Sequence, residues 1–469
     1  MLYRAARLLL TLLIASPAGA YYGRSSTEAS LSFDGAVDAP LDEIPSVGAL
    51  NGGGKIRELA LEMVDEQVSY LTGTFQSESF LQKFHYPGTL DQDESGSHGE
   101  IEFTGAQAAG EGRVRLSYHF KGNAIFHKDA FRHGSVRTVP LKMPYAPDAI
   151  YKISKNGGKK NLCTDPHYDG PGDFFYFWDP DKPDCPLNGD DTNVLRTSGR
   201  LEKKPNTRTT YPDYDRLFSG KDGADPLKIS IFFGFIDPVE KLKKPNMKYK
   251  DDAYLNMKGL EEKLGGEFGF TFNKEESQTK FRLDRNGNPM RKGGINYMRV
   301  WEKSGRYRGK TVNIRLELYL TDTASDSKDA TFHQLLITAL KESDVFLYDG
   351  HSGLGANLDL GMEDLEGVKL DPERYQIFFF NGCTTYPYFT KMYLNAKGGG
   401  RNMQIITTGQ EADTATSVDN AANFLEPFVN LHPLSYQTIL GRLDDSNGDV
   451  GNTLYGVSGD EESKWRPRR

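Results

Sequence analysis

The sequence predicts an α/β protein in which a doubly wound, mostly parallel sheet is preceded by a smaller β-rich domain. Strands covered on both faces require continuous apolar runs, and the second half of the chain has four: KISIFFGFI, DVFLYDG, YQIFFFNG and MQIITTG. Segments with helical spacing separate them, and strand, helix, strand in repetition is typical of a doubly wound fold. Residues 100–154 instead alternate apolar and polar positions, which indicates antiparallel strands.

The first 20 residues have the composition of a secretory signal peptide. Arg4 and Arg7 precede the apolar residues 8–15, and Ala-Gly-Ala at residues 18–20 is a small-x-small cleavage site. The apolar run is too short to span a bilayer, and no later segment reaches the roughly 20 apolar residues that a membrane helix needs. We therefore expect a protein exported to the periplasm or the extracellular space, with no integral membrane segment.

The remaining chain divides into three parts. Residues 21–54 are rich in Gly, Ser, Ala and Asp and are expected to form a flexible leader. Residues 55–225 are expected to hold one amphipathic helix over residues 55–72, a small β-sandwich with a turn at Gly122-Asn123, and a linker from residue 186 onward. Residues 226–469 are expected to form the α/β domain, with an inserted hairpin or antiparallel edge within residues 267–320.

Two features of the earlier part leave alternatives open. The helix over residues 55–72 is either ordinary packing or part of a propeptide that covers an active site until it is cleaved. The aromatic run of residues 174–178, FFYFW, either forms the core of the β-rich domain or faces a peptide or sugar ligand.

Only three cysteines occur, Cys163, Cys185 and Cys383. Cysteines pair in an oxidising compartment, and Cys163 and Cys185 lie close together in one loop-like segment, so we expect a local disulfide between them. Cys383 is then the odd thiol. In an exported protein such a thiol is either a buried small side chain or a reactive group.

The charge pattern argues against nucleic acid as a partner. The formal net charge is -8, and Lys and Arg are scattered among acidic residues rather than gathered in a stripe. No cofactor is expected to be required. Asp445, Asn447 and Asp449 alternate as ligands in calcium loops do, and the alternatives there are a structural calcium ion or an ordinary exposed turn.

Candidate catalytic residues follow two of the predicted strands. The segment DGHSG comes after the strand at residues 345–348, and NGC comes after the strand at residues 377–380. Ligands of parallel sheets bind at the carboxyl ends of the strands, so we expect His351 and Cys383 to meet there. An adjacent imidazole can accept the proton of a thiol and generate the nucleophilic thiolate. The amides that begin the next helix are expected to favour the thiolate.

The order of these residues excludes two classes of enzyme. Papain-like peptidases place Cys before His, whereas His351 lies 32 residues before Cys383 here. A Cys form of the α/β-hydrolase elbow requires G-x-C-x-G, and residues 382–386 read GCTTY. A zinc site is also not indicated, because no closely spaced set of four ligands accompanies the pair.

An apolar strand ending in GH, followed by a second ending in a small residue and Cys, resembles the catalytic pattern of the caspase-like cysteine peptidases, which include caspases, legumains, gingipains and clostripain. The segments that carry the resemblance are YDGHSG and FFFNGC, and the export signal is most similar to the bacterial, gingipain-like branch. The resemblance implies that Cys383 is the nucleophile and His351 the general base and acid. It also implies an oxyanion hole from backbone N–H groups around Ser352, Gly353 and the Gly382-Cys383 turn, with Ser352 standing where the family usually has Gly.

The expected function is therefore that of an exported cysteine endopeptidase that hydrolyses a peptide or protein substrate through a His-Cys dyad and an acyl-enzyme intermediate. The alternative is a caspase-like scaffold without turnover that acts as a surface binding protein. Substrate choice is open. Asp237, Glu411, Asp413 and Asp419 are candidates to pair with a basic residue at the cleavage position, or are solvated loop residues.

Overall fold

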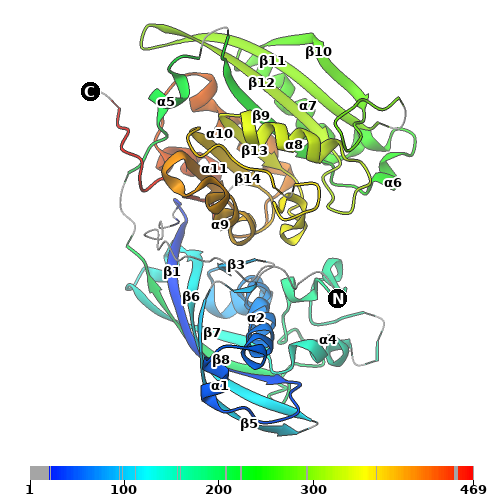
Figure 1. Ribbon diagram of the computed structural model, residues 1–469, viewed down its shortest axis with the longest axis vertical. Coiled ribbons are helices and arrows are strands. Elements are labelled where there is room, and N and C mark those ends of the chain that lie inside the picture. The colour runs from blue at the N-terminus through cyan, green and yellow to red at the C-terminus, as the bar shows by residue number, and fades with distance from the viewer. Residues whose placement is uncertain are drawn as a thin grey trace.

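The structure is a computed structural model of the 469-residue chain. It describes residue 21 and residues 23–93, 96–97, 99–110, 112–155, 157–158, 160–205, 209–221, 224–291, 294–365, 367–447 and 453–467. The predicted signal peptide, residues 1–20, lies outside the described residues. A β-rich half and an α/β half are stacked along the long axis of the molecule (Figure 1).

The β-rich half is built on one antiparallel sheet. Among the described residues this sheet has six strands in the order β2-β6-β1-β8-β7, with β5 also paired to β6. Its elements are β1 (Ser26–Ala39), α1 (Val47–Asn51), α2 (Lys55–Gln76), α3 (Glu78–Phe84), β2 (Gly88–Leu90), the short pair β3 (Gln92–Asp93) and β4 (Gly96–Ser97), β5 (Glu100–Gly110), β6 (Arg113–His127), β7 (Val136–Pro144), α4 (Pro147–Lys155) and β8 (Val194–Lys203). The predicted sandwich is wrong, because helix α2 rather than a second sheet buries the apolar face: its Ala60, Val64 and Leu71 pack with Leu31 and Leu116 in one core.

The expected flexible leader is also wrong over residues 26–39. Strand β1 lies inside the sheet, paired with β6 along its whole length and with β8 over four residues. Its Ala29, Leu31 and Val37 are buried on one face at a period of two, which is the pattern of a strand. The predicted turn at Gly122-Asn123 is likewise wrong, since β6 continues through both residues opposite β1.

The disulfide between Cys163 and Cys185 is present, as the cysteine count predicted. We call residues 163–185 the disulfide loop. It contains two turns of 3₁₀ helix, η2 (Pro166–Tyr168) and η3 (Phe174–Phe177). Phe174 and Trp178 pack with Tyr70 of α2 and with the disulfide itself, so part of the aromatic run forms a core, as predicted.

The α/β half is built on a mixed sheet, which confirms the predicted α/β class. Among the described residues it has eight strands in the order β10-β11-β12-β9-β13-β14-β15-β16. Strands β12, β9, β13, β14 and β15 are parallel, whereas β10, β11 and β16 are antiparallel to their neighbours. Its elements are β9 (Leu227–Gly234), α6 (Val239–Leu242), α7 (Asp252–Gly266), β10 (Thr271–Phe281), β11 (Asn296–Tyr307), β12 (Lys310–Thr321), α8 (Thr331–Glu342), β13 (Val345–Asp349), β14 (Gln376–Asn381), α9 (Thr385–Lys397), β15 (Met403–Thr407), α10 (Ser417–Val429), α11 (Tyr436–Ser446) and β16 (Gly456–Ser458).

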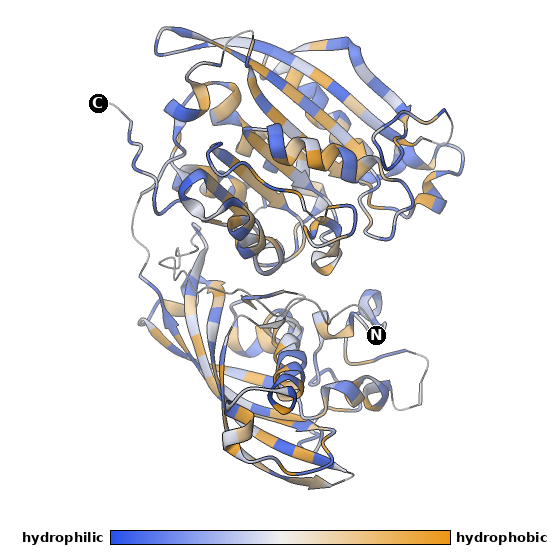
Figure 2. Cartoon of the chain, viewed as in Figure 1, coloured by the Kyte–Doolittle hydropathy of each residue, from blue (hydrophilic) through white to orange (hydrophobic). Residues whose placement is uncertain are grey.

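Helices cover both faces of this sheet, which explains the continuous apolar runs. Alternate residues of β9 point to opposite cores: Ile231 packs with α7, α10 and α11, and Phe232 packs with α8. Figure 2 shows the hydrophobic colouring of these central strands. The expected antiparallel edge at residues 267–320 is present as β10 and β11, although β12, from the same segment, runs parallel to β9.

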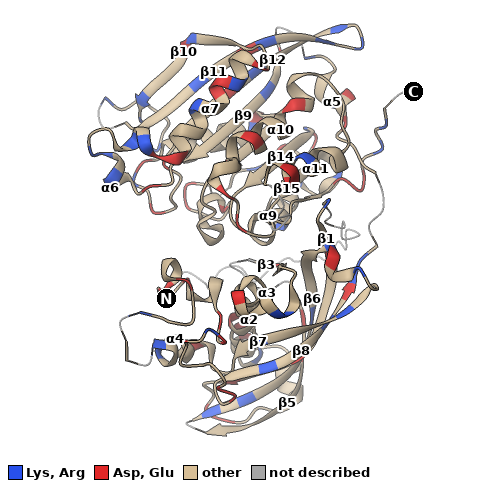
Figure 3. Cartoon of the chain, turned by 180° about the vertical axis from the view of Figure 1, so that it is seen from behind, with Lys and Arg blue, Asp and Glu red and all other residues tan. Residues whose placement is uncertain are grey.

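The boundary between the halves falls earlier than the predicted residue 225. Residues 194–203 of the expected linker form β8, which is a strand of the first sheet. The short helix α5 (Tyr214–Phe218) already belongs to the α/β half, because Tyr214, Leu217 and Phe218 are part of its core. Basic and acidic side chains are interspersed over both halves (Figure 3), in agreement with the charge pattern of the sequence. Among the described residues, no helix is long and apolar enough to cross a membrane.

Candidate active site

His351 and Cys383 follow neighbouring parallel strands at the same level. Asp349, the last residue of β13, is the register partner of Asn381, the last residue of β14. His351 and Cys383 therefore each lie two residues beyond a register pair, and the N–H of Gly350 donates to the carbonyl of Asn381 at 3.3 Å. The sheet thus delivers the imidazole and the thiol to one edge.

The two loops are in contact through Gly382. A Cβ atom at this position would lie 2.7 Å from the carbonyl oxygen of Gly350 and 3.6 Å from the nitrogen of Ser352. Real Cβ atoms do not approach backbone oxygen this closely, so glycine is needed here for close packing.

The strand order locates this edge at a switch point. After β9 the chain forms β12 on one side of β9, then returns to form β13 on the other side. Such a reversal opens a crevice at the carboxyl ends of the strands. A cavity of about 640 Å³ lies there, and it is lined by His351 and Asn357 together with residues that follow β9 and β12, including Ile236, Asp237, Asp322 and Asp329.

The His351 ring is held by a backbone carbonyl. Its Nε2 lies 3.2 Å from the carbonyl oxygen of Ile236, in the loop after β9. A carbonyl only accepts, so this bond places the proton on Nε2 and leaves Nδ1 as the basic nitrogen. The carbonyl of His351 itself accepts hydrogen bonds from the Tyr348 hydroxyl at 2.6 Å and from Asn357 Nδ2 at 2.8 Å. The ring and the backbone are therefore both fixed.

The Cys383 thiol is protonated in this conformation. Burial raises its pKa to about 11, and the charges of Glu411 and Asp349 add to the rise, while a hydrogen bond from the N–H of Ala412 opposes it. Among the described residues, no hydrogen bond joins the thiol to the ring of His351. The structure thus brings the loops of the predicted pair together but not the two reactive atoms into contact.

Backbone donors without an acceptor are present on both loops. Within the described chain, the N–H groups of Ser352, Gly353 and Cys383 have no acceptor. Ser352 has φ of −75°, so this position does not need the left-handed conformation that favours glycine. Gly353 does, with φ of +60°. These free N–H groups are the expected type of oxyanion donor.

The expected contribution of helix α9 is not found. The N–H groups of Thr385 and Tyr386 are bonded to Thr408, and that of Thr384 donates to Gln410 at 3.0 Å. The N–H groups that we expected to face the thiol therefore donate instead to residues that follow β15. Thr384 itself adopts a left-handed conformation with φ of +52°, which turns the chain sharply from Cys383 into α9.

The other half of the molecule also reaches this site. The hydroxyl groups of Tyr176, in the disulfide loop, and Thr384 share a hydrogen bond. Burial raises the pKa of Tyr176 and of Tyr168, and the nearby Cys383 contributes to both rises. Sequence reasoning missed the contact between the disulfide loop and the Cys383 turn. The aromatic run inside a closed loop is the one signal that could have indicated it.

The acidic candidates for substrate recognition lie in different places. Asp237 lines the cavity beside His351, and its carboxylate is paired with Lys241 at 2.6 Å. Glu411 and Asp413 line a second cavity of about 570 Å³ between the two halves. Asp419 instead forms an ion pair with Lys263 on α7 at 3.3 Å. The four carboxylates do not converge.

The predicted calcium residues make protein contacts where they are described. Asp445 is paired with Arg24 at 2.5 Å. Asn447 ends helix α11, and its side chain donates to the carbonyl of Leu443 at 2.7 Å. Asp449 lies outside the described residues. Across the described part of the chain, no group of three or more His, Cys, Asp or Glu side chains is placed to hold a metal ion.

Two comparisons with known proteins complete the description of the site. A scan against models of protein families finds no match for this chain, and a search of curated proteins finds no similar sequence.

Proposed function

We propose that this chain is an exported cysteine endopeptidase with a caspase-like fold, in which Cys383 is the nucleophile and His351 the proton-transfer group. The observation that carries the proposal is the placement of the two residues at equal positions beyond the register pair of β13 and β14. The strand order β12-β9-β13-β14-β15 and the crevice beside His351 support it. The disulfide supports export, because such bonds persist in oxidising compartments.

The proposed reaction follows from the free groups at the site. The sulfur of Cys383 attacks the peptide carbonyl carbon while its proton passes to Nδ1 of His351. The carbonyl of Ile236 accepts from Nε2 and so stabilises the imidazolium. The free N–H groups of Ser352, Gly353 and Cys383 would bind the oxyanion. Collapse of the tetrahedral species breaks the C–N bond, and His351 gives its proton to the departing amine. Water then attacks the thioester with His351 as base, which releases the acid and restores the thiol.

A binding protein without turnover is the second candidate. The raised pKa of Cys383 and the absence of a hydrogen bond to His351 among the described residues favour it. The two candidates differ in whether the thiol forms an acyl bond. A thiol-directed acyl-type probe labels Cys383 in an enzyme and leaves it unlabelled in a scaffold.

The proposal is tested with a fluorogenic peptide library and the variants Cys383→Ala and His351→Ala. Both are expected to lower hydrolysis by at least about a thousandfold, because each removes one member of a catalytic pair. His432→Ala is the matched control, since it removes an exposed imidazole elsewhere in the α/β half. Hydrolysis that persists in purified Cys383→Ala protein contradicts the proposal.

A further inference from the structure

The disulfide loop lies against the turn that carries the candidate nucleophile. Tyr176 is only 1% exposed, although its loop is at the surface of the β-rich half. Its hydroxyl group bonds to Thr384, the residue directly after Cys383. A tyrosine from one half of the molecule is therefore buried against the nucleophile turn of the other half.

Further residues of the same loop extend this contact. The ring of Tyr168 packs against the rings of Tyr176 and Phe177, with centroids 5.2 and 4.8 Å apart. Burial raises the pKa of Glu411, and Asp165 of the disulfide loop adds to the rise. Glu411 precedes Ala412, whose N–H donates to the Cys383 sulfur. The loop thus borders the thiol and the segment that binds it.

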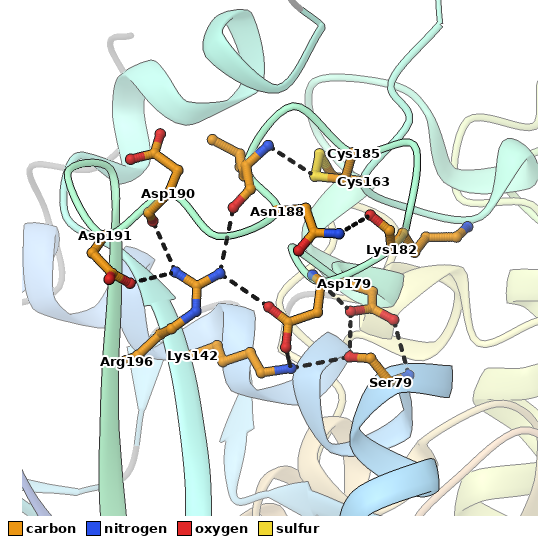
Figure 4. A network of polar contacts seen from close by, with 12 residues as sticks. Ser79, Lys142, Cys163, Asp179, Lys182, Cys185, Asn188, Asp190, Asp191 and Arg196 are labelled. Carbon is orange, nitrogen blue, oxygen red and sulfur yellow. Dashed lines mark hydrogen bonds and ion pairs between the residues drawn. A yellow bond between two sulfur atoms is a disulfide. The ribbon is translucent and has the colours of Figure 1, made fainter.

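The loop is anchored at its base by a partly buried ionic network (Figure 4). Asp181 pairs with Lys142 of β7 at 2.6 Å and with Arg196 of β8 at 3.0 Å. Although burial opposes it, these hydrogen bonds hold the pKa of Asp181 well below its usual range. Asp179 accepts hydrogen bonds from Ser79 of α3. All these anchors belong to the β-rich half, as does the hydrogen bond from Gln76 of α2 to the carbonyl of Tyr176. The bond between the hydroxyl groups of Tyr176 and Thr384 is therefore the contact that must break for the loop to release the Cys383 turn.

The two halves also have contacts away from the thiol. Gln410 Nε2 donates to the carbonyl of Gly88, Lys391 pairs with Asp91 at 2.6 Å, and Tyr21 packs edge-on against Tyr386. These contacts keep the halves together when the loop tip moves. Access to Cys383 therefore depends on the loop rather than on separation of the halves.

A peptide carbonyl must come within about 3–3.5 Å of the sulfur in the correct direction for attack. The Cys383 thiol is half-buried, Tyr176 is bonded to the next residue, and Tyr168 packs on Tyr176, so this side of the thiol is not open to a polypeptide. We propose that the disulfide loop is an intramolecular lid that restricts access of peptide substrates to the Cys383 site, so that the wild-type chain hydrolyses peptides slowly until the tip of this loop is displaced. The role of the lid in peptide hydrolysis rests on the proposed function. The access of reagents to the thiol can be measured without any turnover.

The experiment compares two alkylating reagents of different size on the full chain. Iodoacetamide reports the intrinsic reactivity of Cys383, and a fluorescein maleimide reports access for a bulky molecule. The ratio of the two rates is measured for the wild type, for Tyr176→Phe and for Tyr168→Ala, with circular dichroism to verify folding. Tyr145→Phe is the control, because this tyrosine of the same half contacts Arg115 away from the loop.

The lid predicts that the ratio of maleimide to iodoacetamide rates rises about five- to tenfold in Tyr176→Phe, the effect of losing one hydrogen bond, and by more in Tyr168→Ala. The control should match the wild type. Equal ratios in all folded proteins overturn the lid. Peptide hydrolysis is measured on the same samples. A ratio that rises without any hydrolysis supports the lid while it contradicts the proposed peptidase activity, so the two failures are distinct.

Discussion

Asn381 donates a hydrogen bond to Asp349 across the ends of β14 and β13, at 2.6 Å from Nδ2 to Oδ2. Ser417 donates to the other carboxylate oxygen at 2.9 Å. This pair lies directly beneath the loops that carry His351 and Cys383. Despite both hydrogen bonds, burial raises the pKa of Asp349 to about 6.

The raised pKa predicts a specific dependence of stability on pH. At pH values between about 4 and about 6, Asp349 holds its proton in the folded state but has lost it in the unfolded state. The contribution of Asp349 is thus fully present below pH about 4 and is lost as the pH rises through about 6, an effect of roughly 2–3 kcal/mol. Urea unfolding of wild type and Asp349→Asn at pH 4 and pH 7 measures it. Between pH 4 and pH 7, the free energy of unfolding of the wild type should fall by roughly 2–3 kcal/mol more than that of the variant. Parallel behaviour of the two proteins at both pH values would show that the buried carboxyl is not protonated as described.

Glycine at position 382 is predicted to be indispensable for the packing of the two loops. In Gly382→Ala the new methyl group meets the carbonyl of Gly350 at 2.7 Å, which should lower the free energy of unfolding by about 1–3 kcal/mol and abolish peptide hydrolysis. Gly53→Ala is the control, because a Cβ atom there has no neighbour within 4 Å and the residue lies outside the disulfide loop. If Gly382→Ala is as stable and as active as the control, the contact between the loops is not required.

The pKa of Cys383 is predicted to respond to Glu411. Alkylation by iodoacetamide should follow an apparent pKa near 11 in the folded wild type, against about 8.5 in the unfolded chain. Glu411→Gln removes a negative charge beside the thiol and should shift the folded profile to lower pH. Glu373→Gln removes an exposed carboxylate on the loop before β14 and should leave it unchanged. A folded profile with a midpoint near 8.5 would contradict the burial of the thiol.

Tyr348 is predicted to be a positioning residue for His351. Its hydroxyl donates to the His351 carbonyl at 2.6 Å, so Tyr348→Phe should loosen the imidazole and lower kcat by about tenfold with little change in KM. Tyr375→Phe also removes a buried hydroxyl, one that bonds to Gln404, and serves as the control for lost stability. Equal losses of kcat in both variants would mean that Tyr348 acts only on folding.

The sequence predicted the α/β half well because its strands are buried on both faces. The runs around Phe346 and Phe378 have no polar interruption, and each is followed by glycine and a reactive side chain. Once the two strands are neighbours and parallel, His351 and Cys383 lie at the same edge of the sheet. The helix that begins at Lys55 was also correctly predicted, although it extends to Gln76 rather than residue 72 and its apolar residues Ile56 and Leu59 are exposed.

The errors have identifiable physical causes. The apolar face of β1 is made partly of small residues such as Ala29 and Ala39, so its period of two was hidden among Gly, Ser and Asp. Gly122 suggested a turn, but a glycine also fits inside β6, where a Cβ atom would meet the ring of Phe120 at 2.7 Å. The contacts of the α9 amides with Thr408 and of Tyr176 with Thr384 join distant segments of the chain. Periodicity carries no information about such contacts.

The measurement that tests the central claim most directly is trapping of an acyl-enzyme. Tyr168→Ala protein, in which the lid is weakened, is mixed with a peptidyl ester, quenched in acid and mapped by mass spectrometry. We predict one acyl group on the peptide that contains Cys383. The double variant Tyr168→Ala/His351→Ala should carry none. An unmodified Cys383 in folded protein whose thiol is reached by the fluorescein maleimide would contradict the account.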